Sequence, residues 1–152
     1  MCEFTANAIQ TVQPGETVVF TDTVIPCTQG IVRHRDDTGA FVLSGNVTRK
    51  PCGCMPSSAH YGVSFGANIA LPADETAPAE ISVVFAIDGV AIPSTAMRVT
   101  PAVADRYWNV ARSTNVAVWR GCCQTLSITN TSAVAINVQN ANITFDRTDL
   151  NY

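Results

Sequence analysis

The residues best suited to chemistry in this sequence are six cysteines, at positions 2, 27, 52, 54, 122 and 123. Four of them form two close pairs, Cys52-Gly53-Cys54 and Cys122-Cys123, and four thiolates can hold a zinc ion in a tetrahedral site. The spacing argues against zinc, because paired ligands in structural zinc sites are usually separated by two to four residues. Neighbouring cysteines in a strand also point to opposite faces, so Cys122 and Cys123 are poorly placed to bind one ion together.

Two other interpretations of the cysteines remain open. An even number permits disulfides, for instance between the loop around Cys54 and the region of Cys122, although six cysteines allow 15 pairings. Alternatively, the thiols stay reduced and serve as small core residues. Cys2 is a candidate for a cross-link between subunits. We therefore keep Cys52, Cys54, Cys122 and Cys123 as a candidate disulfide or thiol cluster and expect no bound metal.

The two histidines offer little for acid–base catalysis. His34 alternates with arginines beside Asp36 and Asp37, which is typical of a solvated polar strand. His60 follows Ser57-Ser58, and neither serine has the G-x-S-x-G context of a hydrolase nucleophile. No Gly-rich phosphate loop is present. We expect a protein that is not an enzyme and that binds no cofactor.

Three large aromatic residues lie in the second half of the chain: Tyr107, Trp108 and Trp119. One interpretation places them in the core. The other places them in a subunit interface or a ligand platform, the two settings in which Trp and Tyr are favoured. We keep all three as candidate interface or ligand-binding residues.

Composition limits the partners of the chain. Hydrophobic residues make up 47% and charged residues 14%, against roughly 25% charged residues in an average globular domain. The net charge is −3 and the nine basic residues are scattered, with Arg49-Lys50 the only adjacent pair. This pattern predicts no binding to nucleic acid or to an anionic membrane. So little charge favours burial of surface between subunits.

The start of the chain does not resemble a targeting signal. It lacks a basic region and an apolar region, and Glu3 interrupts it at once. No apolar run approaches the roughly 18 residues of a membrane helix. We therefore expect synthesis and retention in a bacterial cytoplasm, unless the protein is carried out on a larger assembly.

Alternation of apolar residues predicts an all-β fold. From 60 to 71 every second residue is apolar, whereas Gly62, Ser64, Gly66 and Asn68 occupy the other face, which is the period of a half-buried strand. Residues 80–88 repeat the pattern and end at the turn dipeptide Asp88-Gly89. The other expected strands cover 17–21, 30–35, 40–45, 96–100, 107–119 (in two parts hinged near 113–114), 125–128, 135–138 and 142–145.

About ten short strands separated by Pro and Gly predict a β-sandwich. We find no boundary within residues 1–152, so we expect one jelly-roll domain of antiparallel strands. Residues 1–12 would form an N-terminal arm or a first strand.

Residues 38–45, TGAFVLSG, followed after a loop by 61–68, YGVSFGAN, resemble central strands of the tumour-necrosis-factor-like superfamily. That superfamily includes the globular heads of complement proteins. Segments 119–121, 126–128 and 141–145 fit its closing strands. The cysteines have no counterpart in the family pattern. The resemblance is closest to bacterial and phage members, such as fibre or decoration proteins of tailed phages and spore-surface proteins. It implies a ten-stranded jelly roll, a homotrimer packed along flat apolar faces, and a display or binding role.

Together these observations predict a structural protein. We expect a homotrimeric head on a virion surface, as a phage capsid decoration or head-fibre protein, in contact with other virion or coat proteins. Adhesion to a receptor or to cell-surface glycans would extend that role. The alternatives are a spore-surface protein of the exosporium type and a cupin-like sugar-modifying enzyme. The cupin alternative is weakened because such a site needs two or three histidines, with a glutamate, on facing strands.

Overall fold

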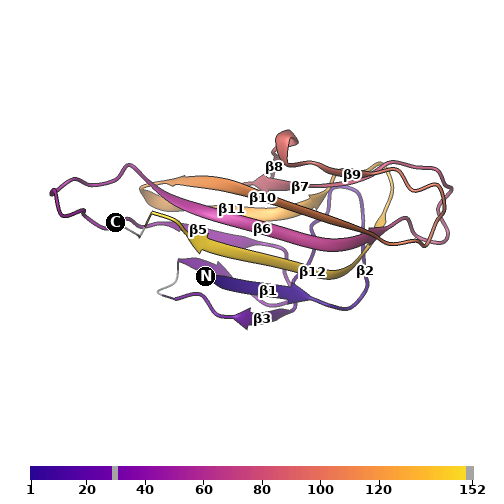
Figure 1. The fold of residues 1–152 in the computed structure, drawn as a ribbon, viewed down its shortest axis with the longest axis horizontal. Coiled ribbons are helices and arrows are strands. Elements are labelled where there is room, and N and C mark those ends of the chain that lie inside the picture. The colour runs from indigo at the N-terminus through magenta and orange to yellow at the C-terminus, as the bar shows by residue number, and fades with distance from the viewer. Residues whose placement is uncertain (29–30, 150–152) are drawn as a thin grey trace.

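Two antiparallel sheets pack face to face in the computed structural model, which describes residues 1–28 and 31–149 apart from the side chain of residue 122 (Figure 1). The predicted all-β jelly-roll sandwich is confirmed. The sheet nearer the viewer in Figure 1, here the front sheet, runs in the order β10, β6, β12, β1, β3, and β2 also pairs with β12. Its strands are β10 (Trp108–Trp119), β6 (Ser58–Ala70), β12 (Ile136–Arg147), β1 (Cys2–Ala6), β3 (Asp22–Ile25) and β2 (Gln10–Val12).

The second sheet, here the back sheet, runs in the order β4, β5, β11, β7, β8, and β9 also pairs with β7. A single turn of 3-10 helix, η1 (Pro93–Thr95), connects two of its short edge strands. The strands are β4 (Val32–His34), β5 (Phe41–Gly45), β11 (Gly121–Asn130), β7 (Ile81–Ile87), β8 (Val90–Ala91) and β9 (Met97–Val99). All of these strands are shorter than the three long strands of the front sheet, β10, β6 and β12.

The core forms where the inward faces of the two sheets meet. The alternation predicted for 60–71 is confirmed from 61 to 69, because Val63, Phe65, Ala67 and Ile69 are buried while residues 62, 64, 66 and 68 are more exposed. Edge-to-face contacts link Phe4, Phe20 and Phe41, with centroids 5.0–5.2 Å apart for the Phe4–Phe41 and Phe20–Phe41 pairs. Such contacts add to the hydrophobic stabilisation of the sandwich.

His34 belongs to this aromatic cluster, and its prediction as a solvated residue is wrong. Its ring is stacked on Phe41 at 4.2 Å. Nδ1 lies 3.0 Å from the carbonyl oxygen of Ala40, and Nε2 lies 3.2 Å from that of Phe20. The alternation with Arg33 and Arg35 turns the histidine inward, because successive residues of a strand point to opposite faces.

One strand predicted in the N-terminal half is wrong. Residues 17–21 do not form a continuous strand. They contribute isolated pairings, Thr17 with Thr129 and Phe20 with Thr38. The strand beside β1 is β3, which follows this segment. The apolar pattern at 17–21 is nevertheless real, because Val18 and Phe20 are fully buried.

Two further corrections concern the long strands. No hinge interrupts β10, because each of its residues from Trp108 to Trp119 has a partner on β6. The two strands expected at 135–138 and 142–145 are one strand, β12, with a register shift between Gln139 and Asn142. Asn140 has a φ of 53° at this point. One extra residue there lets apolar side chains face the core on both sides of the irregularity.

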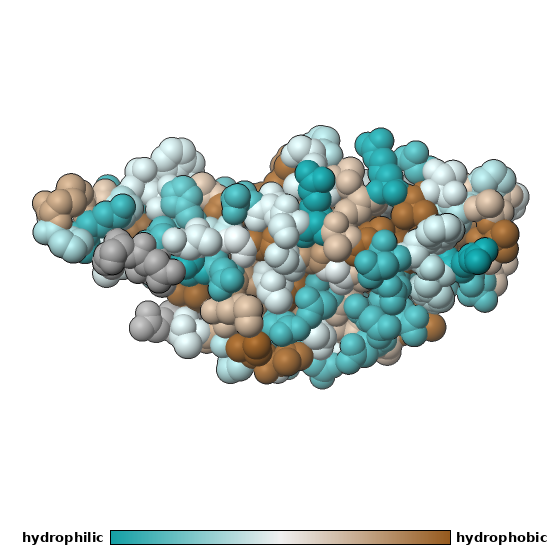
Figure 2. Space-filling model, in the orientation of Figure 1, coloured by the Kyte–Doolittle hydropathy of each residue, from teal (hydrophilic) through white to brown (hydrophobic). Residues whose placement is uncertain are grey.

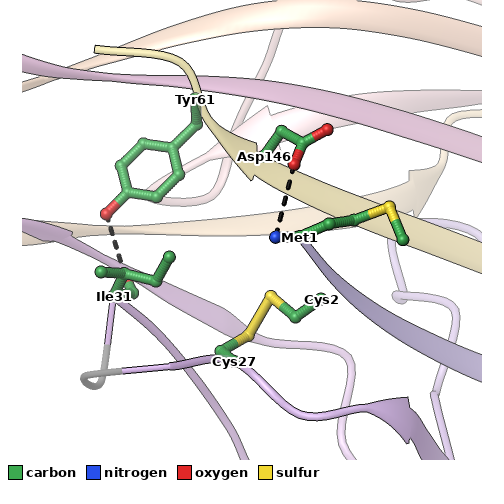
Figure 3. Close-up of a disulfide and its surroundings, with 6 residues drawn as sticks. All are labelled: Met1, Cys2, Cys27, Ile31, Tyr61 and Asp146. Atoms are coloured by element: carbon green, nitrogen blue, oxygen red, sulfur yellow. Dashed lines mark hydrogen bonds and ion pairs between the residues drawn. A yellow bond between two sulfur atoms is a disulfide. The ribbon is translucent and has the colours of Figure 1, made fainter. Parts of the chain in front are cut away.

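A disulfide joins Cys2 to Cys27 within the chain (Figure 3). Cys2 is fully buried, and the pairing of Glu3 with Ile25 returns the chain to the start of β1, leaving 4.7 Å between the two Cα atoms. This bond corrects the expectation of a cross-link from Cys2 to another subunit, and it corrects the interpretation of these two cysteines as reduced core residues.

Asn130 closes the end of β11, and its substitution tests the packing of this end of the sandwich. The fully buried side chain donates to the carbonyl oxygens of Val12 (3.0 Å) and Val134 (3.1 Å) and accepts from the Ser132 amide (2.8 Å). Asn130→Ala would leave these backbone groups without hydrogen-bond partners, so we expect a loss of about 3 kcal/mol in the free energy of unfolding. Urea denaturation measures this loss. The exposed Asn7 provides the control, and equal effects of Asn130→Ala and Asn7→Ala would contradict the argument.

Candidate functional site

The outer surface of the front sheet, here the front face, is built from small uncharged side chains. On β6 the outward residues are Gly62, Ser64, Gly66 and Asn68. They pair with outward residues of β10, and the surface continues onto β12 with Asn142 and Thr144. Much of this face appears in pale, near-neutral colours in Figure 2. The outward β10 residues opposite β6 are Asn109, Ala111, Ser113, Asn115 and Ala117.

Glycine at positions 62 and 66 is not required by the chain's own fold. A Cβ atom at Gly66 would meet its nearest neighbour, the carbonyl oxygen of Val110, at 3.8 Å, and one at Gly62 would meet Thr148 at 3.5 Å. Both are ordinary contacts, and neither glycine has the positive φ that favours glycine. Glycine weakens a strand interior and often marks the close approach of another backbone. The missing side chains therefore leave room above the front face.

Hydrogen bonds hold the polar side chains of the front face in fixed positions. The Ser64 and Ser113 hydroxyls are 2.9 Å apart, and the Asn109 amide donates to the Asn68 side chain over 3.1 Å. The acidic side chains of β1 and β12 are engaged as well. Glu3 accepts a hydrogen bond from Asn142, and Asp146 lies 3.4 Å from the N-terminal amine (Figure 3). The face is thus ordered and carries little unpaired charge.

The three candidate aromatic residues do not form one platform, and the interpretation that places the tryptophans in the core is wrong. Trp108 is 44% exposed and Trp119 is 71% exposed. They occupy opposite ends of β10, about 36 Å apart at roughly 3.3 Å per residue. Tyr107 is half-buried beside Trp108. Trp119 lies opposite Ser58 on β6, so it extends the front face at one end.

Ser58 and His60 lie close together near Trp119. The Ser58 hydroxyl is 3.1 Å from Nε2 of His60. His60 is exposed, and no carboxylate of the described residues contacts its ring. His34 lies on the opposite sheet, with both ring nitrogens against carbonyl oxygens. The two histidines therefore do not converge on one site.

The described residues contain no group of three or more His, Cys, Asp or Glu side chains placed to hold a metal ion.

An open hollow of about 430 Å³ lies on the back sheet, lined by Arg33, Arg35 and Val42 among others. Across the part of the chain that the structure covers, no helix has the length and apolarity needed to cross a membrane.

A cluster of Tyr61, Arg147 and Asp149 fixes the base of the loop between β5 and β6. The Tyr61 hydroxyl lies 2.6 Å from the carbonyl oxygen of Ser44 and 2.9 Å from that of Ile31 (Figure 3). The Arg147 guanidinium lies over the Tyr61 ring at 5.2 Å and donates to the carbonyl oxygen of Asn46 over 2.6 Å. This cluster was missed in the sequence, because Tyr61 is far along the chain from Arg147 and Asp149.

Arg147 and Asp149 form a nearly buried ion pair with two hydrogen bonds, of 2.5 and 3.1 Å. Burial alone would raise the pKa of Asp149, but the hydrogen bonds and charge of Arg147 hold this pKa below its ordinary value. Burial raises the pKa of Tyr61, partly offset by the charge of Arg147. The cluster is therefore stable with Asp149 ionised and Tyr61 neutral.

Cys52 and Cys54 are bonded to each other in the exposed loop between β5 and β6. Gly45 at the start of this loop pairs with Gly121, so the loop and the start of β11 lie at the same end of the sandwich. The side chain of Cys122 lies outside the description. A cluster that joins Cys52 and Cys54 to Cys122 and Cys123 therefore stays a prediction.

The Arg147–Asp149 pair predicts a pH dependence of stability. Because the pKa of Asp149 is lowered on folding, its contribution is present above the unfolded-state value of about 3.9 and is lost as pH falls through the lower folded-state value. Asp149→Asn should cost about 2 kcal/mol at pH 7 and flatten the stability profile below pH 4. Urea denaturation between pH 2 and 7 measures this. Asp146→Asn, at an exposed ion pair, serves as the control. Parallel pH profiles for the wild type and Asp149→Asn would contradict the assignment.

Comparison with solved structures supports the fold. The globular domain of a zebrafish complement 1qA protein matches with a TM-score of 0.56 and 11% identity, covering 93% of this chain and 92% of that domain. A family 35 carbohydrate-binding module from Clostridium thermocellum gives a TM-score of 0.35 at 12% identity, with coverage of 93% and 90%. Another from Paenibacillus barcinonensis gives 0.36 at 17% identity, with coverage of 96% and 98%. No family model and no curated protein matches the sequence.

Proposed function

We propose that this chain is a non-enzymatic display protein whose copies assemble through the front face into a homotrimer on a virion surface. The observation that carries the proposal is the pair Gly62 and Gly66, at which the chain has room for side chains that the sequence omits. A second copy is the favoured occupant. In a ring of three the front face of one chain meets a different surface of the next, and small polar groups offer that surface both donors and acceptors. The number three follows from the family resemblance noted in the sequence.

The front face has the properties of a surface that another protein covers. Its hydroxyls and amides already pair across neighbouring strands, so covering them leaves few groups unsatisfied. Its acidic groups are paired within the chain, so two copies in contact would repel each other little. The three long strands β10, β6 and β12 make the face wide enough for a partner to lie along it (Figure 1).

A display role also fits the arrangement of the titratable residues. The two histidines lie on different sheets, and the His34 ring packs in the aromatic core. A cupin-like enzyme would need them on facing strands around one metal. We therefore favour a structural role over the enzymatic alternative.

Substitution of a glycine on the front face tests the assembly. Light scattering at micromolar concentration should give about three times 16.2 kDa for the wild type. Gly66→Val should remain folded, since a Cβ at this position meets nothing closer than 3.8 Å, but its added methyl groups should block the approach of a partner and give a monomer. Ala40→Val, at an exposed position just before β5 of the back sheet, is the matched control and should stay trimeric. A monomeric wild type, or a Gly66→Val variant that still assembles, would overturn the proposed interface.

The location has a separate test. Particles purified by density gradient from a lysate of the source culture, analysed by mass spectrometry, should contain this chain in fixed ratio to capsid proteins. Recovery with purified spores instead would favour the spore-surface alternative, and recovery in the soluble fraction alone would contradict both.

Adhesion to glycans is a second candidate function, favoured by the exposure of Trp119. An exposed indole can stack on the apolar face of a sugar ring, and Ser58 and His60 lie beside it to hydrogen-bond hydroxyls. Trp119 lies about 13 Å along β10 from Asn115, the partner of Gly62, and about 26 Å from Ala111, the partner of Gly66, so it lies beyond the glycine pair at one end of the strand.

A glycan array tests the adhesion candidate. The wild type should bind a subset of glycans and Trp119→Ala should lose at least about tenfold in affinity, the equivalent of one stacking contact. Trp108→Ala is the control at the other end of the strand and should bind normally. An array on which the wild type binds nothing would exclude this candidate.

A further inference from the structure

The loop between β5 and β6, residues 46–57, extends beyond the ends of both sheets (Figure 1). It carries the Cys52–Cys54 disulfide. Both cysteines and the glycine between them are exposed. A thiolate from outside can therefore reach this disulfide, and exposed disulfides are the ones that usually take part in exchange.

The second disulfide of the chain provides an internal contrast. Cys2 is fully buried and its bond to Cys27 spans 25 positions, whereas the Cys52–Cys54 bond spans two. In the chain-entropy account, a disulfide stabilises a fold more when it closes a longer loop. The Cys2–Cys27 bond thus has the character of a structural link. The Cys52–Cys54 bond contributes far less to the fold and can open without unfolding it.

Contacts around Cys52 favour it as the sulfur that leaves. The backbone N–H of Cys54 donates to the sulfur of Cys52 over 3.4 Å. Arg49 and Lys50, the only adjacent basic pair of the chain, precede the ring and are separated from Cys52 by Pro51 alone. Arg49 donates to the carbonyl oxygen of Gly53 over 2.7 Å, which keeps its guanidinium beside the ring. Nearby positive charge and an N–H donor stabilise a thiolate.

The backbone keeps the two cysteines together without the sulfur bond. Lys50 N–H donates to the carbonyl oxygen of Cys54 over 2.9 Å, and Gly53 N–H donates to that of Lys50 over 2.8 Å. Gly53 has a φ of 81°, the left-handed region that a tight turn of this kind requires. After the bond opens, this turn holds the two sulfurs near each other, so that the ring can close again.

We propose that Cys52–Cys54 is a thiol–disulfide exchange site that accepts a cysteine thiolate of a partner protein. The incoming thiolate attacks Sγ of Cys54, the bond between the two sulfurs breaks, and its electron pair leaves on Sγ of Cys52. The products are a mixed disulfide on Cys54 and a thiolate on Cys52. One disulfide is consumed and one is formed, so the incoming thiolate is the only reductant required. Attack of Cys52 on the mixed disulfide releases the partner and closes the ring. A protein is the favoured source of the thiolate, because the loop projects past the ends of both sheets and carries its exposed disulfide out to where another protein can contact it.

Graded reduction of the oxidised full-length chain tests the site. The protein is incubated with increasing glutathione at neutral pH, quenched with an alkylating reagent and mapped by peptide mass spectrometry, with the peptide of Cys122 and Cys123 read separately. Glutathione should appear on Cys54 at concentrations at least about tenfold below those that open Cys2–Cys27. Opening of both bonds over the same range, or alkylation of Cys52 and Cys54 before glutathione is added, would overturn the proposal.

Variants identify the roles of the two sulfurs. Cys52→Ser removes the thiolate that resolves the mixed disulfide, so adducts formed on Cys54 from oxidised glutathione should persist. In the wild type, once the Cys52–Cys54 disulfide has opened, the thiolate of Cys52 should displace the glutathione from Cys54. The double change Arg49→Gln with Lys50→Gln should slow exchange about threefold or more at low salt. Arg33→Gln with Arg35→Gln, on the back sheet, is the matched control for net charge. An equal effect of the two double changes would contradict the role given to the basic pair.

A cysteine-containing peptide in place of glutathione tests the source of the thiolate. Exchange with the peptide at a rate comparable to that of glutathione supports a protein partner. Exchange with glutathione alone would overturn the choice of a protein as the partner. Circular dichroism of every variant monitors the fold. Since the exchange is read at the loop cysteines, its failure is distinguishable from a failure of trimer assembly.

Discussion

Strand β6 has to serve two surfaces at once, and most of the structure depends on this requirement. Its thirteen residues alternate between the hydrophobic core and the front face, and both neighbours, β10 and β12, follow its register over most of their length. Large side chains such as Phe65 and Ile69 fill the sandwich. Apart from His60, the opposite face from Ser58 to Asn68 holds small polar groups and glycine. A slip of one residue in the pairing of β6 would move its core residues to the outer surface and its small residues into the core. The burial of the core therefore also fixes which residues form the outer surface.

The cluster of Tyr61, Arg147 and Asp149 connects this strand to the exposed end of the molecule. Tyr61 is one of the inward residues of β6, yet its hydroxyl reaches the carbonyl groups of Ile31 and Ser44. Arg147 adds the carbonyl of Asn46. The first residue of the projecting loop is thus held by a nearly buried charge, whereas the ring formed by Cys52 and Cys54 at its far end is exposed to solvent. Rigidity at the base and accessibility at the tip are suited to presenting a reactive group at a defined place.

The sequence predicted what depends on local alternation, and it failed where distant segments decide. The strands at 60–71 and 80–88 and the sandwich itself follow from period-two patterns, so they could be recognised. The hinge expected near Ser113-Thr114 does not exist, because pairing with β6 overrides the weak strand propensity of small polar residues. The bend at Asn140 was readable only as a change of phase between Val138 and Ala141. The interpretation that places the tryptophans in the core rests on their size, but an edge strand such as β10 can leave a large side chain in solvent. The disulfide of Cys2 and Cys27 depends on the path of residues 17–25, which local patterns did not give.

The same disulfide determines how the fold would bear tension. A pulling force applied at Met1 enters the chain at Cys2 and passes through the sulfur bridge directly to Cys27. The intervening residues, which include β1, β2 and β3, carry none of this load, so the hydrogen bonds between β1 and β12 are not peeled open one by one. The force reaches the back sheet next, through β4 and its pairing with β5. The covalent link thus keeps the force off residues 3–26, which is a useful property for a domain tethered at that end and exposed to shear.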